Sequence, residues 1–187
     1  MIHDGGMARD GAPGIGTLRH LRRGRRLPNV ELPTTAGRLV NLAQTRGRTI
    51  LYCYPFTGRP GVPDPPGWDA IPGAHGSTPQ TEGFRDLYEG FRQVGAAVFG
   101  LSAQSTEYQR EMVERLCVPF EMISDECLRL QRALALPTFA TGGVVYLARL
   151  TLCLREGCIE RVYYPIRAPA AHAREVCAWL GMTERGH

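Results

Sequence analysis

A short apolar run followed at once by a proline-rich segment most constrains how this chain can fold. Residues 49–54 read TILYCY, a continuous run of β-forming side chains that is typical of a central strand buried on both faces. Residues 55–76 then contain six prolines, at positions 55, 60, 63, 65, 66 and 72, so they form neither a helix nor a central strand. Because loops of this length are usually functional, we expect this one to shape or cover a site.

The segments on either side of this loop predict an α/β fold. Before it, residues 30–32 and 39–42 predict a small hairpin. After it, apolar periodicity predicts helices over 78–93, 105–116, 125–135 and 170–180, and strands over 97–101, 120–123, 144–147, 150–154 and 159–164. Alternating elements of this kind favour one domain, over residues 27–187, with a mixed central sheet flanked by helices.

The positive charge of the chain is concentrated in its first 26 residues. All 22 basic residues are arginines, and six of them lie in residues 1–26 with two acids, which accounts for the whole net charge of +4. We expect this Gly- and Arg-rich stretch to be a flexible leader that does not bind nucleic acid. A chain without lysine forms no lysine Schiff base and has no Walker A loop. No apolar run is long enough to cross a membrane.

The cysteine spacing indicates neither a dithiol nor a metal site. No Cys-x-x-Cys pair is present, and no glycine-rich nucleotide motif or His-Glu-x-x-His motif occurs, so no cofactor or metal is expected. Most of the six cysteines lie in apolar stretches, which predicts buried, reduced thiols in a cytoplasmic protein. Cys153 and Cys158 flank a turn and could face each other across a hairpin. Cys53 is interpreted as structural, and it becomes a candidate nucleophile only if its side chain reaches a pocket.

The motifs around the loop occur in the order found in the peroxiredoxins. The strand ends in Tyr54-Pro55, and residues 76–80, GSTPQ, open the next helix, where that family has Gly-Cys-Thr. Further matching segments are 27–33 (LPNVELP), 99–102 (FGLS), 124–125 (SD) and 149–152 (RLTL). Over residues 27–182 the chain resembles the peroxiredoxin Q, or bacterioferritin comigratory protein, branch of the family. The resemblance implies a thioredoxin-like fold of the peroxiredoxin type.

The resemblance also implies an activity and a nucleophile position. The activity is the thiol-dependent reduction of hydrogen peroxide or organic hydroperoxides, with position 77 as the point of attack. On the family's pattern Arg149 stabilises the thiolate and the peroxide, Thr57 orients the peroxide, and Gln80 orients Arg149. A helix N-terminus and a nearby arginine would lower the pKa of a thiol at position 77.

The remaining implied contacts concern the substrate and the reductant. The backbone N–H groups of Gly76 and Ser77 would bind the substrate oxygens, with His75 and Thr78 beside them. The expected partners are the peroxide and an external thiol of the thioredoxin, glutaredoxin or small-molecule type. The chain is expected to be a monomer or a homodimer.

Three positions depart from the family's pattern. Position 77 is serine, which cannot cycle through a sulfenic acid, so this chain is expected to be inactive as a peroxidase. Position 82, where some members have a resolving cysteine, is Glu82, and the threonine three residues before the nucleophile is replaced by Ala74.

Ser77 has two explanations. Either a serine silences a peroxidase, or it is natural in a repurposed protein. A repurposed protein would bind a small molecule or catalyse redox-neutral chemistry with His75, Glu82 and Arg149. A non-catalytic interaction module is a third reading, and it predicts that Arg149 and Gln80 no longer face Ser77.

Overall fold

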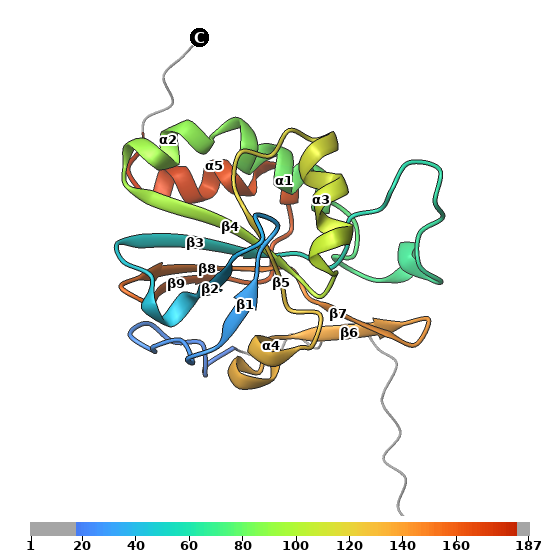
Figure 1. Ribbon diagram of the computed structural model, residues 1–187, viewed down its shortest axis with the longest axis horizontal. Helices are drawn as coiled ribbons and strands as arrows, with labels where there is room; N and C mark the ends of the chain where they lie inside the picture. Colours follow the sequence, from blue (N-terminus) through green and yellow to red (C-terminus); the bar gives the residue numbers. More distant parts are fainter. Residues whose placement is uncertain (1–17, 183–187) are drawn as a thin grey trace, which may run out of the picture.

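A five-stranded mixed sheet forms the centre of the computed structural model, which describes residues 18–182 (Figure 1). In order across the sheet, the strands are β5 (Met122–Ser124), β4 (Ala96–Ser102), β3 (Arg48–Cys53), β8 (Leu150–Arg155) and β9 (Cys158–Tyr163). β3 is parallel to β4, and β4 to β5, whereas β8 is antiparallel to both β3 and β9. The mixed sheet and the central place of the TILYCY strand confirm the expected architecture.

Helices cover both faces of this sheet (Figure 1). One face carries α1 (Ser77–Asp86), α2 (Tyr88–Gln93), α3 (Thr106–Arg115) and α5 (Pro169–Trp179). The other face carries α4 (Arg129–Leu134) and the hairpin of β1 (Glu31–Pro33) and β2 (Leu39–Asn41). Outside the sheet lie the two-stranded hairpin of β6 (Thr138–Thr141) and β7 (Val144–Leu147) and two short 3-10 turns, η1 (Leu42–Gln44) and η2 (Trp68–Ala70).

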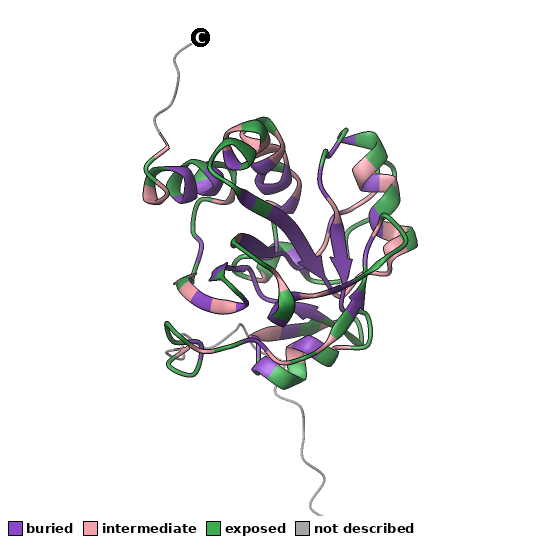
Figure 2. Ribbon diagram, turned by 60° about the vertical axis from the view of Figure 1, so that its left-hand side comes forward, coloured by how far each residue is buried: buried purple, intermediate pink, exposed green. Residues whose placement is uncertain are grey.

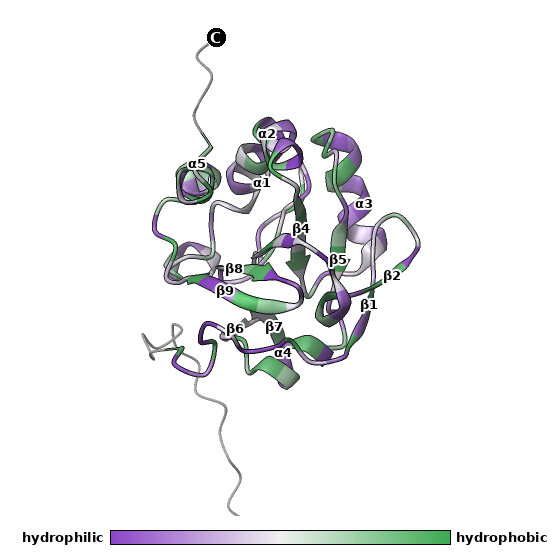
Figure 3. Ribbon diagram, turned by 90° about the vertical axis from the view of Figure 1, so that its left-hand side faces the viewer, coloured by the Kyte–Doolittle hydropathy of each residue, from purple (hydrophilic) through white to green (hydrophobic). Residues whose placement is uncertain are grey.

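Strand alternation in β3 divides the core into two layers. Ile50 and Tyr52 face the layer under α1, α2, α3 and α5, whereas Leu51 and Cys53 face the layer over α4. The central strands are accordingly buried along almost their whole length (Figure 2), and β4 and β8 are coloured largely as hydrophobic in Figure 3. Cys53 is fully buried, and this burial raises the pKa of its thiol well above the ordinary value. The structural reading of Cys53 is therefore confirmed.

The end of the expected leader belongs to the folded body. Leu21 is 3% exposed and joins the core layer beneath β8. The Gly24 N–H donates to the Ile159 carbonyl at 2.7 Å, and Arg26 forms a β-bridge with Cys158. The ordered region therefore begins before residue 27, which corrects the expected boundary. The burial of one leucine among arginines outweighs the polar composition of this stretch, and residues 1–17 lie outside the described residues.

Two expected helices have different bounds in the structure. The helix expected over 78–93 is interrupted at Leu87, whose φ of −101° and ψ of 4° separate α1 from α2. The helix expected from Asp125 begins four residues later, after Leu128 in a left-handed conformation. Asp125 still caps it, because its carboxylate accepts from the N–H groups of Leu130 and Gln131 at 3.1 and 2.7 Å.

None of the six cysteines, all of which lie within the described residues, forms a disulfide, but they are not all buried. Cys53, Cys153 and Cys177 are buried, whereas Cys117 and Cys127 are exposed. In the β8–β9 register Cys153 pairs with Arg161, and Cys158 pairs with Arg155, so the two cysteines do not face each other. Cys158 lies three residues before Arg161, which is the residue opposite Cys153.

A buried histidine predicts that the fold loses stability in mild acid. His172 on α5 is 1% exposed, and its Nε2 lies 2.9 Å from the Thr151 hydroxyl. Burial lowers its pKa below the ordinary value, although Glu175 partly opposes this effect. Because the imidazole protonates more readily in the unfolded chain, the unfolded chain binds more protons than the folded chain as the pH falls below about 6.5. The free energy of unfolding therefore decreases as the pH is lowered from about 6.5 through the pKa of the folded state.

Urea denaturation between pH 7.5 and 5 measures this dependence. The His172→Gln variant should show a flatter profile over the same range. The matched variant His20→Gln, at an exposed histidine, should keep the native slope. An unchanged profile in His172→Gln would contradict the assignment of the acid sensitivity to this side chain.

Candidate functional site

The N-terminus of α1 requires a glycine for the chain to enter the helix. Gly76 caps α1 with φ 102° and ψ 12°, a conformation that L side chains rarely adopt. A Cβ at this position would lie 2.8 Å from Cγ of Pro169, the first residue of α5. Ser77 follows as the first residue of α1, and it is only 3% exposed. Its side chain therefore lies at the positive end of the helix dipole, where free N–H groups favour an anion.

A buried arginine lies directly against Ser77. Arg149 lies in the short link between β7 and β8, it is 4% exposed, and its Nη2 donates to Ser77 Oγ at 3.1 Å. The same nitrogen donates to the His75 carbonyl at 2.9 Å, and Nη1 donates to Gln80 Oε1. Desolvation lowers the pKa of Arg149 to about 10, so the guanidinium remains charged at neutral pH. Position 77 therefore combines a helix N-terminus with a fixed cation.

The structure brings Gln80 and Arg149 together with Ser77. Gln80 is fully buried one turn into α1, and its carbonyl oxygen holds the guanidinium that reaches Ser77. Arg149 also spans the end of the long loop, through bonds of 3.3 Å to the carbonyls of Gly73 and Ala74. The hypothesis of a non-catalytic module predicted that Arg149 and Gln80 would not face Ser77. The hydrogen bond from Arg149 to Ser77 counts against that hypothesis.

Thr57 does not lie where the sequence placed it. Its hydroxyl donates to Gln104 Oε1 at 3.3 Å, and its N–H donates to the same oxygen at 3.1 Å. Phe56 and Gly58 line the hollow beside Ser77, but Thr57 between them does not. Thr57 is 1% exposed and bonds to Gln104 instead of lining the pocket, so the structure does not bring its hydroxyl beside Ser77.

His75 and Glu82 do not form an acid–base pair with Ser77. The exposed His75 ring pairs with Asp69, with Nε2 at 2.7 Å from Oδ1, and within residues 18–182 it makes no hydrogen bond to Ser77. Glu82 is half-buried on α1 and does not line the hollow, whereas Gly76 and Thr78 do. The arrangement therefore lacks the contacts of a serine hydrolase.

The proline-rich loop forms the outer wall of a hollow of about 380 Å³ beside Ser77, which we call the Ser77 pocket. Besides Ser77 it is lined by Phe56, Gly58, Arg59, Pro60, Asp64, Trp68, Ala74, His75, Gly76, Thr78, Pro79 and Arg115. Trp68 is 4% exposed in an aromatic cluster with Phe139 and Tyr146, which anchors the loop, and the loop projects from the body near β6 and β7 (Figure 1). The expectation that the loop shapes the pocket is confirmed.

Sequence reasoning missed the two arginines of this wall. Arg59 lies in the loop with its guanidinium 4.0 Å from the centroid of the Tyr108 ring on α3. Arg115, at the end of α3, donates from Nη2 to the Gly58 carbonyl at 3.2 Å. The order of charges along the chain contained no signal for either, because each is brought to the pocket only by the contact between the loop and α3.

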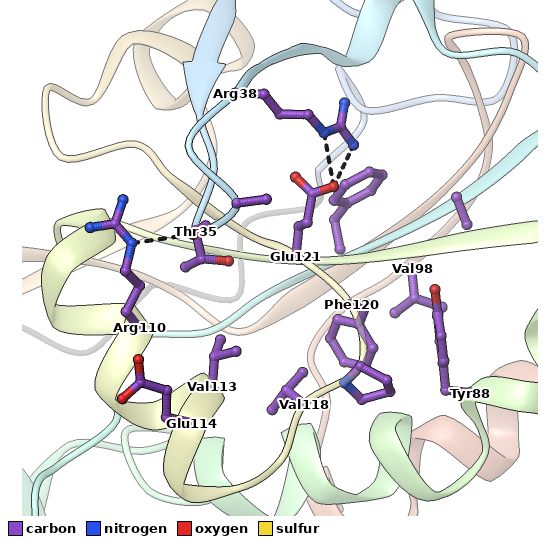
Figure 4. Close-up of a pocket in the computed structure, with 14 residues that line it drawn as sticks. Thr35, Arg38, Tyr88, Val98, Arg110, Val113, Glu114, Val118, Phe120 and Glu121 are labelled. Atoms are coloured by element: carbon purple, nitrogen blue, oxygen red, sulfur yellow. Dashed lines mark hydrogen bonds and ion pairs between the residues drawn. The ribbon is translucent and has the colours of Figure 1, made fainter.

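A larger hollow, of about 540 Å³, lies beside α3 and the β4–β5 edge (Figure 4). Two internal contacts cross it: Arg38 pairs with Glu121 at 2.6 Å, and the Arg110 Nε donates to the Thr35 carbonyl at 3.2 Å (Figure 4). Among the described residues, no three His, Cys, Asp or Glu side chains gather as a metal site, and no helix is long and apolar enough to cross a membrane. The reactive constellation is therefore the one around Ser77.

The fold and this site place the chain in a known class. Residues 22–173 match the model of the Redoxin family, and the chain belongs to that family. Its curated relatives include peroxiredoxin Q of rice chloroplasts, 28% identical over 82% of this chain and 64% of that protein's length. Another is chloroplast peroxiredoxin Q of Sedum lineare, also 28% identical, over 82% of this chain and 74% of the relative. The chain is thus similar to the peroxiredoxin Q branch, while spanning less than two thirds of the rice protein.

Solved structures of the same branch share the fold. Peroxidoxin BcpB of Mycobacterium tuberculosis superposes with a TM-score of 0.70 at 22% identity, over 87% of this chain and 97% of that one. Peroxiredoxin Q of Xanthomonas campestris superposes with a TM-score of 0.68 at 23% identity, over 85% and 96% of the two chains. The thioredoxin-like fold of the peroxiredoxin type is confirmed.

Proposed function

We propose that the Ser77 pocket is a peroxiredoxin-type site for the thiol-dependent reduction of hydroperoxides, with position 77 as the nucleophile position. The observation that carries this proposal is the buried Arg149 guanidinium bonded to the first side chain of α1. A helix N-terminus and a desolvated cation stabilise a thiolate, and the same donors stabilise the negative charge that develops on a peroxide oxygen. Ser77 marks this point, and Gln80 holds the cation in place.

The reaction requires a thiolate at position 77. The thiolate sulfur attacks one peroxide oxygen, the S–O bond forms, the O–O bond breaks, and the leaving oxygen takes a proton to give water or an alcohol. The resulting sulfenic acid condenses with one external thiol to a mixed disulfide and releases water, and a second thiol reduces that disulfide and restores the thiolate. An external reductant is consistent with Glu82 in place of a nearby cysteine. A serine hydroxyl stays protonated and cannot form a sulfenic acid, so the native chain retains the binding site without the redox step.

The partners and the cellular compartment belong to the same proposal. The substrate is a hydroperoxide and the reductant an external thiol of the thioredoxin, glutaredoxin or small-molecule type. The protein acts as a monomer or a homodimer in the cytoplasm. The described cysteines form no disulfide although Cys117 and Cys127 are exposed, which favours a reducing compartment.

Capture of the oxidised intermediate tests the proposal. A Ser77→Cys variant treated with one equivalent of hydrogen peroxide should gain one oxygen atom at the introduced thiol, and a sulfenic-acid-selective dione should trap it there, as read by peptide mass spectrometry. The matched control is Ser105→Cys, which places a thiol at the N-cap of α3 without a buried arginine. Equal labelling of the two introduced thiols would overturn the proposal, because a helix N-terminus alone would then account for the reactivity.

A further inference from the structure

The guanidinium of Arg59 has hydrogen-bonding capacity that the fold does not use. It stacks on the Tyr108 ring at 4.0 Å, it lines the Ser77 pocket, and within the described chain it makes no hydrogen bond. Its Nε is buried without a hydrogen-bond partner, and its ion pair with Oε2 of Glu111 is long, at 3.9 Å. Stacking fixes the plane of the guanidinium, so its donors are preorganised.

We propose that Arg59 is an anion anchor that selects hydroperoxides carrying a carboxylate. This inference rests on the proposed function, because it assigns the substrate class of the same pocket. A planar guanidinium presents two parallel donors that match the two oxygens of a carboxylate, and such charge-assisted pairs are the strong ones. Ser77 and Arg59 line one hollow, so one ligand can contact both.

The size and lining of the pocket define the rest of the ligand. A volume of about 380 Å³ far exceeds that of hydrogen peroxide and lies in the range of small organic ligands. The lining combines polar groups with the rings of Phe56, Pro60 and Trp68 from the loop, so it offers an organic ligand apolar contacts as well as charged ones. The substrate that fits is an organic hydroperoxide with an apolar or aromatic body, its peroxide group toward Arg149 and its carboxylate toward Arg59.

Two arginines line the Ser77 pocket, and of these only Arg59 has a guanidinium that makes no hydrogen bond within the described residues. Arg115 lines the same pocket, but its Nε donates to Glu111 Oε1 at 2.6 Å and its Nη2 to the Gly58 carbonyl. The exposed Asp64 also lines the pocket and opposes an incoming anion, as does Glu111 at the longer distance. Two acids near one anchor predict that removing either should strengthen anion binding, whereas removing Arg59 should abolish it.

The native serine protein allows this inference to be tested without turnover. The probes are 2-phenyl-2-propanol, the alcohol produced from cumene hydroperoxide, and its para-carboxylate. By titration calorimetry the native chain should bind the carboxylate about tenfold more tightly than the neutral alcohol, which corresponds to about 1.4 kcal/mol. Arg59→Gln should abolish this difference, while the matched control Arg22→Gln, at an exposed arginine that does not line the pocket, should preserve it.

A variant that is expected to raise the affinity for the carboxylate distinguishes loss of the anchor from disruption of the loop, because a disrupted loop would only lower the affinity. Asp64→Asn removes an exposed carboxylate that lines the pocket, leaves the Glu111–Arg115 ion pair intact, and should raise the affinity for the carboxylate several-fold, with no effect on the neutral alcohol. Equal affinities of the two alcohols for the native chain, or no gain in Asp64→Asn, would overturn the anchor.

The reactive form of the pocket separates this inference from the proposed function. In Ser77→Cys, the ratio of kcat/KM for the para-carboxylate of cumene hydroperoxide over cumene hydroperoxide should match the ratio of the two binding constants. A carboxylate preference in binding combined with an unreactive introduced thiol would refute the peroxidase site and leave the anion anchor standing.

Discussion

Replacing Ser77 by cysteine is expected to convert a chain that leaves hydroperoxide intact into one that consumes it continuously with excess dithiol. The fold needs no rearrangement, because cysteine is nearly isosteric with serine, and Ser77 already lies at the N-terminus of α1 against Arg149. Both features lower the pKa of a thiol and stabilise the charge on the departing oxygen. We expect turnover faster than that of Ser105→Cys by a factor of about 10³ or more.

The measurement follows the loss of hydroperoxide and the oxidation of dithiol together. The native chain controls for its own six cysteines, of which Cys117 and Cys127 are exposed. A native chain that turns over as fast as Ser77→Cys would show that one of these thiols, and not position 77, carries the reaction. Equal thermal midpoints of the two proteins would exclude an effect of unfolding.

Removing the guanidinium from this active variant is expected to cost a factor of about 10²–10³ in kcat/KM. In the Ser77→Cys background, Arg149→Met deletes the donor 3.1 Å from the side chain at position 77 and places an apolar group of similar length in the same space. Loss of the cation also raises the pKa of the introduced thiol toward that of a free cysteine, so less thiolate is present at neutral pH. The pH–rate profile should shift to higher pH, and the ultraviolet absorbance of the thiolate should shift with it.

The control for this double variant is Arg155→Met, which removes an exposed arginine from the end of β8. It should leave both the rate and the thiol pKa unchanged. A similar loss in Arg155→Met would mean that the overall charge, and not the buried contact, governs the reaction. Arg149→Met also removes the hydrogen bonds to the carbonyls of Gly73, Ala74 and His75, which could lower the stability of the fold. Thermal unfolding followed by far-ultraviolet circular dichroism therefore accompanies the kinetics.

The sequence allowed the central strand and the long loop to be predicted because local signals and global fold agree there, in the TILYCY run and in the proline-rich segment. The position of the site came from the resemblance of residues 76–80 to the family's motif. The pairing of Gln80 with Arg149 was available only through the resemblance to a family, since 69 positions separate the two residues. The strand β6 was missed because TFAT has one large apolar side chain and pairs only with β7.

Thr57 and Arg59 show what the sequence could not provide. Both residues lie in the proline-rich loop, which has no helical or strand periodicity. The direction of their side chains therefore cannot be predicted from the sequence. Thr57 hydrogen-bonds to Gln104, and the Arg59 guanidinium stacks on the Tyr108 ring. Each contact joins residues that are at least 47 positions apart in the sequence. Leu21 is a similar case, because its burial depends on β8 and β9 far along the chain.

The contact between Gly76 and Pro169 has a consequence for how the protein is made. Position 77 is fixed from three sides, by Gly76, by Arg149 and by the start of α5 at Pro169. A ribosome delivers the chain from its N-terminus, so the strand pair β3–β4 can form while the arginine and the α5 contact are still unmade. A nascent chain therefore lacks the guanidinium beside position 77 until residue 149 has been synthesised, and the contact of Gly76 with Pro169 follows only with the start of α5.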